Sequence, residues 1–217
     1  MTVKSKSVSN IGAKRRSLIM SAALKAFAQD GYKGASIQKI ADAAQLPKAN
    51  VLYYFSSKQS LYSEVMASIL DMWNSSFDDV NEHDCPAESL AKYIAEKMEV
   101  SRTNPFSSKV FAIEIINGGS NLDRSFKQQH KLWVQGRVEV IEKWIANGKL
   151  NAVDPQFLLY HIWSTTQHYA DFSTQIKQLR GKAMTKQEFA EATKTVIKLI
   201  LHGCGLEVPV QYQLADS

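Results

Sequence analysis

A run of eight residues that begins at Lys48 carries side chains suited to recognising a DNA duplex. Asn50 presents a hydrogen-bond donor beside an acceptor, the pair that matches the edge of adenine, and the small Ala49 permits close approach. Lys48 suits guanine or phosphate, and the hydroxyls of Tyr53 and Tyr54 suit phosphate oxygens. These residue types predict base readout near Asn50, with backbone contacts around it.

The aromatic residues of this run also allow a purely structural interpretation, in which they form a corner that packs two helices together. We accept that interpretation for Phe55, which we expect to be buried. For Tyr54 both interpretations stay open. Tyr53 and Lys48 lie in a basic and otherwise polar stretch, and we expect them to face DNA.

Two further residues complete the predicted DNA-binding set. Lys58 lies at the start of a predicted long helix, and a helix N-terminus attracts anions such as phosphate. Ser36 stands where a short helix begins, and its hydroxyl can cap that helix by accepting a backbone N–H. We therefore predict that Ser36 and Lys58 belong to the DNA-contacting surface.

Two short helices are needed to position these side chains. The sequence predicts one over 36–44 and another over 47–55, separated by a tight turn, which is the spacing of a helix-turn-helix motif. An amphipathic helix over 13–30 precedes them, with Gly31 as its C-cap. A long fourth helix follows over about 57–80. The second short helix is the predicted recognition helix.

The charge distribution agrees with an N-terminal part that binds a polyanion. The 217 residues carry a net charge of +5. Residues 1–58 hold ten basic and two acidic side chains, a net charge of +8, so the remaining 159 residues carry −3. A basic face is often merely solvated, so the charge is informative only together with the helix-turn-helix.

The rest of the chain also predicts helices, so the expected fold class is all-α. No alternating pattern predicts a strand, and no apolar run reaches the length of a membrane span. The first ten residues do not form a signal peptide. The helices are expected over 87–102, 105–117, 122–147, 155–178 and 186–203. Three of them are expected to start near Pro86, Pro105 and Pro155. The last three breaks between these helices fall near glycines.

The predicted helix over 155–178 offers a ligand site. Tyr160, Trp163, Gln167 and Asp171 share one face at helical spacing. An amide and a carboxylate turned inward need polar partners, and beside an indole they suit a small planar ligand rich in amide-type donors and acceptors. The alternative, that Gln167 and Asp171 brace neighbouring helices, is equally compatible with the periodicity.

Two residues elsewhere are further candidates for that site. Trp73, on the predicted fourth helix, can stack on a ligand or belong to the core. Glu114 is a carboxylate inside an apolar run and is a second candidate for a buried polar group. His161 and His168 lie seven residues apart, without the i, i+4 spacing of helical metal ligands, and are expected at core or interface positions.

The last predicted helix has an apolar face that suits a homodimer. The alternative is that this face is buried within one subunit. Cys85 and Cys204 show no metal-ligand spacing and are too few for a disulfide framework, so we expect a cytoplasmic protein with reduced thiols, no metal site, no cofactor and no catalytic residues. The face consists of Phe189, Val196, Ile197, Ile200 and Cys204, with Thr193 among them.

Residues 13–58 resemble the N-terminal domain of the TetR family of bacterial regulators. The resemblance is carried by GYKGASIQKIADAA and by LPKANVLYYFSSKQSLY. It implies a transcription regulator that binds a double-stranded DNA operator as a homodimer, with one recognition helix per subunit in the major groove. It also implies a small-molecule effector, with repression relieved by the ligand as the expected direction.

Three positions depart from the family pattern. Gln45 stands where glycine is common in the turn, which predicts a non-glycine residue in a left-handed conformation. Pro47 replaces a capping serine and is expected to be the first helical residue. Ala49-Asn50 replaces a frequent Gly-Thr pair. We expect these departures to change the operator sequence and to leave the motif intact.

Further segments are similar to the members of that family that respond to uracil and thymine: EKMEVSRTNP, IEKWIANGKLNAVDPQ and IWSTTQHYADF. The likeness runs over roughly residues 15–180. It implies regulation of pyrimidine catabolism by a pyrimidine base, uracil or thymine. The ligand-binding residues that the resemblance implies are Trp73, Trp163, Gln167 and Asp171.

The predicted domain organisation has four parts: a flexible basic tail over 1–12, the DNA-binding domain over 13–58, an effector-binding and dimerisation domain over 59–204, and a C-terminal tail over 205–217. Three alternatives stay open. They are a family member that answers to another small molecule, an architectural DNA-binding protein without an effector, and a helical enzyme with a basic surface. Operator binding measured with and without pyrimidines separates them.

Overall fold

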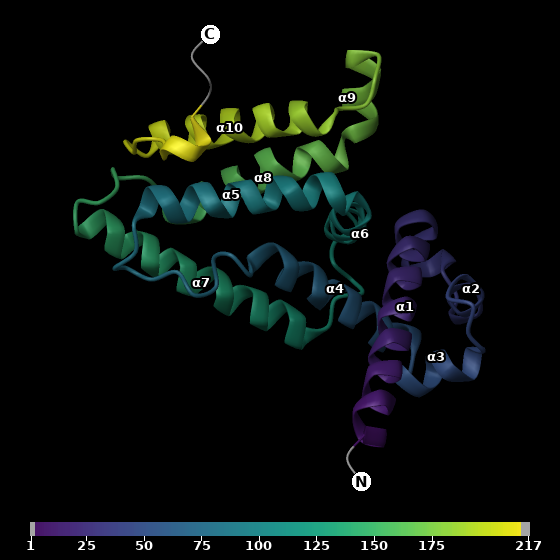
Figure 1. Ribbon diagram of the computed structural model, residues 1–217. Helices are drawn as coiled ribbons and strands as arrows, with labels where there is room; N and C mark the ends of the chain where they lie inside the picture. The colour runs from purple at the N-terminus through teal and green to yellow at the C-terminus, as the bar shows by residue number, and fades with distance from the viewer. Residues whose placement is uncertain (1–2, 214–217) are drawn as a thin grey trace. The chain divides into compact units, whose positions relative to one another are not determined.

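The computed structural model describes residues 3–213, with side chains described from Ile11 onward, and all regular secondary structure in this range is helical (Figure 1). The predicted all-α fold class is confirmed. The helices are α1 (Val3–Gly34), α2 (Ile37–Ala43), α3 (Lys48–Tyr54), α4 (Lys58–Asn74), α5 (Pro86–Thr103), α6 (Pro105–Ile116), α7 (Arg124–Ala146), α8 (Pro155–Asp171), α9 (Ser173–Arg180), α10 (Lys186–Gly203) and the short 3₁₀ helix η1 (Val210–Tyr212).

The chain forms two compact units. Unit 1 comprises the residues up to Ile69 together with Lys109–Asp123, and unit 2 comprises Leu70–Ser108 together with the residues from Arg124 onward. Two helices, α4 and α6, therefore begin in one unit and end in the other. The segment Lys109–Asp123 joins the N-terminal residues, which the boundary predicted after residue 58 did not foresee.

Unit 1 is built around the amphipathic stripe of α1. Phe27 on α1 is buried, as are Ile40 on α2 and Val51 on α3, and the ring of Phe27 meets the edge of Tyr62 at 4.8 Å between centroids. Gly31 interrupts α1 with φ 68° and ψ 175°, a conformation that L side chains rarely adopt, so the predicted helix stop is a glycine for a steric reason.

Unit 2 is organised around α5, which packs against α8 and α10, while α7 also contacts α8 (Figure 1). Its mainly aliphatic core includes an aromatic group, in which Phe77 stacks on Tyr93 at 4.7 Å and tilts against Trp144 at 6.4 Å. Pro86, Pro105 and Pro155 are the first residues of α5, α6 and α8, as predicted. At these positions the missing backbone N–H costs no helical hydrogen bond.

The structure differs from the predicted elements in four places. Residues 3–12 of the predicted tail belong to α1, whereas Met1 and Thr2 lie outside the described residues, as do 214–217. The fourth helix ends at Asn74 rather than near residue 80. The helix expected over 155–178 is two helices, because Phe172 adopts φ −106° and ψ 22° between them.

The fourth difference concerns the predicted C-terminal tail. Over 205–213 the chain packs on unit 2, with Val208 buried and η1 formed by residues 210–212. Lys194 donates to the carbonyl of Gln213 at 2.8 Å, and Gln211 donates to Glu88 at 2.8 Å. This segment lacks a helical period because it follows the surface of other helices.

Candidate functional site

The turn between α2 and α3 has the geometry of a helix-turn-helix. Ser36 caps α2, because its Oγ accepts from the backbone N–H of Lys39 at 3.2 Å. Gln45 has φ 55°, so the predicted left-handed non-glycine residue is present. Pro47 is the N-cap of α3, with φ −58° and ψ 142°, and not its first helical residue as predicted. Its extended ψ sets the direction in which α3 leaves the turn.

One face of α3 is closed and the other is open. Val51 and Phe55 are fully buried, and the guanidinium of Arg16 lies 5.2 Å from the centre of the Phe55 ring. The burial predicted for Phe55 is confirmed. Tyr53 is 83% exposed, and Lys48 and Ala49 are exposed beside it. The open face therefore holds the side chains that suit a duplex.

Asn50 and Tyr54 border this open face. Both are half-buried, and the ring of Tyr54 meets that of Tyr53 edge to face at 5.1 Å. The Tyr54 hydroxyl lies 3.7 Å from the point where a Cβ on Gly12 would stand, so Tyr54 packs beside α1. Tyr54 thus combines a packing role with a hydroxyl near the open face.

Lys58 has partners within unit 1. Its Nζ donates to the carbonyl oxygens of Tyr32 at 2.8 Å and Ala35 at 3.0 Å, and it lies 4.5 Å from the centre of the Tyr32 ring. An ammonium has three N–H donors, so these two bonds leave one for a phosphate. Lys58 first ties the start of α4 to the end of α1, which sequence reasoning did not foresee.

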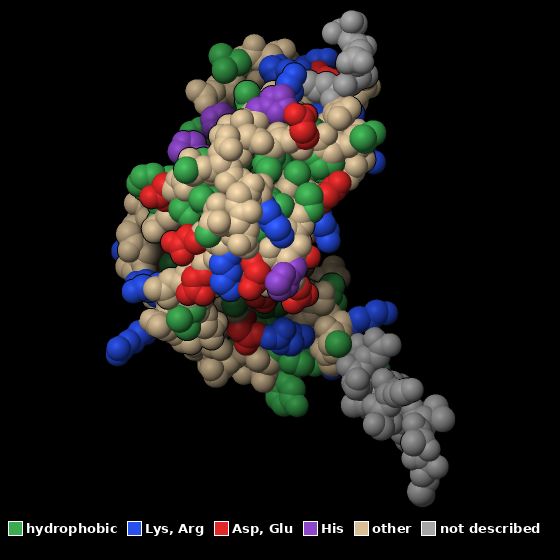
Figure 2. Space-filling view, turned by 90° about the vertical axis from the view of Figure 1, so that its left-hand side faces the viewer, with side chains coloured by type: hydrophobic (Ala, Val, Ile, Leu, Met, Phe, Trp, Pro, Cys, Tyr) green, Lys and Arg blue, Asp and Glu red, His purple; other side chains and the backbone are tan. Residues whose placement is uncertain are grey.

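Two other cations of unit 1 form ion pairs. Arg16 pairs with Glu64, and Lys39 lies 3.1 Å from Asp30. Lys48 is outside the ion pairs of the described residues, which leaves its charge available. Figure 2 shows acidic and basic side chains intermixed across the middle of one face of the molecule. Lys48 is a candidate for DNA binding because it lies on α3, and not because of the total charge of the chain.

Unit 2 contains a cluster of aromatic rings around a buried ammonium, which we call the Lys97 cluster: Trp73, Tyr93, Lys97, His130, Trp163 and Asp171. Lys97, on α5, is only 3% exposed. Its Nζ lies 4.5 Å from the centre of the Trp73 ring and 5.7 Å from that of Tyr93. Trp73 is 4% exposed. Trp73, a predicted ligand-binding residue, therefore lies beside the ammonium of Lys97, which the sequence analysis did not identify.

Trp163 joins the cluster through a hydrogen bond. Its indole Nε1 donates to the hydroxyl of Tyr93 at 2.9 Å, and its ring lies 6.0 Å from that of His130 and 5.6 Å from that of Tyr160. Burial and the positive charge of Lys97 lower the pKa of His130. Trp163 is half-buried.

Asp171 supplies the negative charge of the cluster. The hydroxyl of Ser108 donates to its Oδ1 at 2.5 Å. Burial lowers the pKa of Lys97 to about 7, and the nearby charge of Asp171 opposes that shift. Gln167 lies one turn before Asp171 on α8 and is half-buried, as the shared helical face predicted.

Lys97 left a weak signal in the sequence. It stands on the apolar stripe of α5 with Leu90, Ile94 and Ser101, at the spacing that places all four on one side of a helix. The three others are buried, so a lysine in this stripe must be buried as well. A charged residue at a core position of an amphipathic helix is the pattern that would have identified it.

Glu114 belongs to a different network, in unit 1. It is buried, as predicted, and accepts from the Tyr62 hydroxyl at 2.8 Å and from the backbone N–H of Asn121 at 2.7 Å. Burial and the Glu114 carboxylate both raise the pKa of Tyr62. Gln59 donates to the Asn121 carbonyl at 2.7 Å, so Glu114 holds the loop after α6 to the start of α4.

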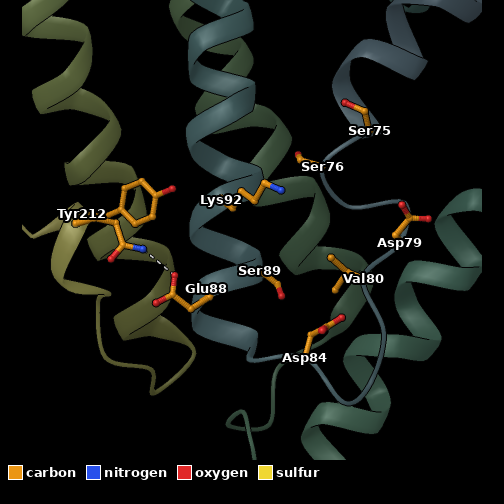
Figure 3. A pocket seen from close by; sticks show the side chains of 10 residues that line it. Ser75, Ser76, Asp79, Val80, Asp84, Glu88, Ser89, Lys92 and Tyr212 are labelled. Atoms are coloured by element: carbon orange, nitrogen blue, oxygen red, sulfur yellow. Dashed lines mark hydrogen bonds between the residues drawn. The ribbon is translucent and has the colours of Figure 1, made fainter.

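A separate cavity of unit 2, about 440 Å³, is lined by acidic and hydroxyl side chains (Figure 3). Asp79, Asp84 and Glu88 line it with Lys92. Glu88 is held by its hydrogen bond with Gln211, drawn as a dashed line. None of the predicted site residues lines this cavity. Another cavity, about 510 Å³, lies between α7 and α8 and is lined by Tyr160, whose ring touches that of Trp163.

The apolar face predicted for dimerisation is mostly used within unit 2. Val196, Ile197 and Cys204 are buried in the core of the chain, so the alternative interpretation holds for them. The exposed apolar residues are different ones. Leu199 on α10 is 70% exposed and Phe157 on α8 is 59% exposed. α8 and α10 contact each other.

Within residues 3–213, no helix is long and apolar enough to cross a membrane. The same residues include no group of three or more His, Cys, Asp or Glu side chains placed to hold a metal ion.

Two family models match this chain. The model of bacterial regulatory proteins of the tetR family matches residues 19–65, and that of the YcdC-like protein C-terminal region matches residues 66–207. The chain is thus a helix-turn-helix transcriptional regulator that binds DNA. It belongs to the TetR family, which also sets it among regulators rather than enzymes.

The curated relatives include the HTH-type transcriptional regulator RutR of Escherichia coli strain K12. It is 36% identical over 194 residues, which are 89% of this chain and 91% of the relative. The uncharacterized regulator YhgD of Bacillus subtilis is 23% identical over 67% of this chain and 77% of its own length. The 194 matched residues extend over both units of the chain.

Solved structures share the fold. AibR in complex with isovaleryl coenzyme A and operator DNA matches with a TM-score of 0.63 at 18% identity, over 85% of this chain and 97% of that one. A transcriptional regulator from Rhodococcus sp. Rha1 matches with a TM-score of 0.61 at 16% identity, over 89% and 99%. At these identities the structural likeness shows the fold alone.

Proposed function

We propose that this regulator represses genes of pyrimidine catabolism and is released from its operator by uracil or thymine. The observation that carries the proposal is the Lys97 cluster, in which aromatic rings lie beside a buried ammonium and a carboxylate. It is supported by the similarity of the segments around Trp163 and Lys97 to pyrimidine-responsive members of the family.

The operator is bound through the open face of α3. Asn50 reads a base edge, while Lys48, Tyr53, Tyr54, Ser36 and the remaining N–H of Lys58 contact phosphates. The protein acts as a homodimer, whose two recognition helices enter successive major grooves about 34–36 Å apart. The supporting observation is that Tyr53 and Lys48 are exposed while the opposite side of α3 is closed.

Dimerisation uses the exposed sides of α8 and α10. Phe157 and Leu199 are apolar and solvent-exposed in the single chain, and the two helices that carry them pack together. Covering such side chains by the same face of a second copy removes apolar area from water. The contact is therefore formed by residues other than the buried face of α10.

The effector is a planar ring with both carbonyl oxygens and N–H groups. The amide of Gln167 offers a donor and an acceptor, and Asp171 offers an acceptor, which together match a pyrimidine dione. The half-buried Trp163 and the buried Trp73 provide aromatic surfaces for the ring. Apolar surfaces with a few polar groups are the usual make-up of a small-molecule site.

Release follows from the two helices shared by both units. Ser108, in the unit 2 part of α6, holds Asp171, and Glu114, in the unit 1 part of the same helix, holds Tyr62. Effector binding that moves α4 or α6 changes the spacing of the recognition helices. A coupling free energy of about 1–3 kcal/mol corresponds to a roughly 5- to 150-fold change in operator affinity.

A gel-shift titration tests this function with an operator from the regulator's own upstream region, with and without uracil or thymine. We expect the shifted band to disappear with either base. Gln167→Ala should abolish the response and keep the shift, whereas Gln187→Ala, an exposed glutamine on α10, should respond normally. A shift indifferent to pyrimidines but lost with another metabolite would assign a different effector, and indifference to every metabolite would favour an architectural role.

A further inference from the structure

The side chain of Lys97 is almost fully buried and lies among aromatic rings. Among the described residues its close contacts are the ring faces of Trp73 and Tyr93, and no carboxylate forms an ion pair with it. Asp171 is near enough to act on Lys97 electrostatically, but its Oδ1 accepts from Ser108 instead. The aromatic faces stabilise the charge, yet they do not replace hydrogen-bond acceptors.

Such an ammonium favours one class of ligand. A lysine ammonium can only donate hydrogen bonds, so a carbonyl oxygen of a bound molecule satisfies it. An amino group on the ligand is also a donor and leaves both groups unpaired in a site already shielded from water. A site that requires an acceptor at one position strongly rejects an analogue that lacks it, because the buried polar group of the protein then stays unpaired.

We propose that Lys97 is the specificity-determining residue of the effector site, which donates to a ring carbonyl oxygen and thereby selects oxo-pyrimidines over amino-pyrimidines. This inference rests on the proposed function and goes beyond it by naming the atom that discriminates. Uracil and thymine present a carbonyl where cytosine presents an amino group. Asp171 complements Lys97, because it accepts from a ring N–H of the same ligand.

The experiment is calorimetric titration of uracil and of cytosine into the intact protein at pH 6, below the pKa of about 7 that burial gives Lys97, so that the ammonium is present. Lys97→Met is the informative variant, because methionine keeps an unbranched apolar stem of similar length and removes the charge. Replacement of a buried charge by an apolar group is often neutral or stabilising, so the variant should fold, which thermal unfolding checks. Lys92→Met is the matched control, because Lys92 lies on the same helix but is exposed.

We expect the wild-type protein and Lys92→Met to bind uracil and to reject cytosine. Lys97→Met should bind uracil about 10- to 100-fold more weakly, which is the range for one hydrogen bond to a charged group. Its preference for uracil over cytosine should shrink by a similar factor.

Each other outcome has a distinct meaning. Uracil affinity of Lys97→Met within twofold of the wild type would overturn the inference while the proposed function stands. If Lys97→Met loses affinity for uracil and for cytosine by the same factor, the inference would also be overturned, because Lys97 would then only support packing. Failure of the wild-type protein to bind uracil or thymine would remove the proposed function and this inference together.

Discussion

The burial of Lys97 makes the stability of this protein depend on pH, and Lys97→Met should remove that dependence. The pKa of Lys97 is lowered from its ordinary 10.5 to about 7, because burial disfavours the ammonium. Between these values the unfolded chain holds the proton and the folded chain has lost it. Stability therefore rises as pH rises through this window, and below about pH 7 both states are protonated and the dependence ends.

The magnitude follows from the two pKa values. The slope approaches about 1.4 kcal/mol per pH unit above the folded pKa, so the free energy of unfolding should increase by about 2 kcal/mol between pH 7 and pH 9. Asp171 and His130 are the other titratable groups that act on Lys97. Burial and the positive charge of Lys97 both lower the pKa of His130.

The assay is urea unfolding of the wild-type protein and Lys97→Met at pH 6, 7, 8 and 9. Titratable groups that do not interact with Lys97 cancel in the difference between the free energies of unfolding of the two proteins. We expect that difference to favour Lys97→Met most at pH 6 and 7, and to shrink by about 2 kcal/mol by pH 9. A difference that stays constant from pH 7 to pH 9 would show that Lys97 is solvated, and the reasoning about its burial would be wrong.

Three further predictions concern other parts of the molecule. Lys48→Ala should weaken operator binding about tenfold. It should also reduce, by about one, the slope of the logarithm of the binding constant against the logarithm of the salt concentration, measured by fluorescence anisotropy. An unchanged slope would place Lys48 away from phosphates. Gln45→Gly should raise the free energy of unfolding by about 1 kcal/mol, because glycine adopts φ 55° without steric cost, and a lower thermal midpoint would contradict this. Leu199→Glu should convert the dimer into monomers, measured by light scattering after size exclusion. Lys198→Glu, which changes an exposed neighbour, should stay dimeric. A dimeric Leu199→Glu would place the interface elsewhere.

The helix-turn-helix could be predicted from the sequence because its determinants are local. Ser36 caps α2 through a residue three positions away, and Gln45 adopts positive φ in a turn of fixed length. The burial of Phe55 follows from the period of α3. The prolines marked the starts of α5, α6 and α8 because proline tolerates only a few helical positions.

Some site residues could not be assigned from periodicity. The face of α10 with Val196 and Ile197 was predicted to contact a partner chain but lies in the core of its own unit, because periodicity reports that a face is buried and not what covers it. Lys58 was expected to face phosphate, and its bonds to the carbonyls of Tyr32 and Ala35 join residues far apart in sequence.

The amino-acid sequence by itself determined the class of this protein, since each signal for the DNA-binding motif spans only a few residues. Tertiary structure alone decided the composition of the Lys97 cluster, which draws side chains from α4, α5, α7 and α8. The ionisation of Lys97 depends on how completely those helices exclude water. That property arises only when all of them are packed together, so no local pattern encodes it.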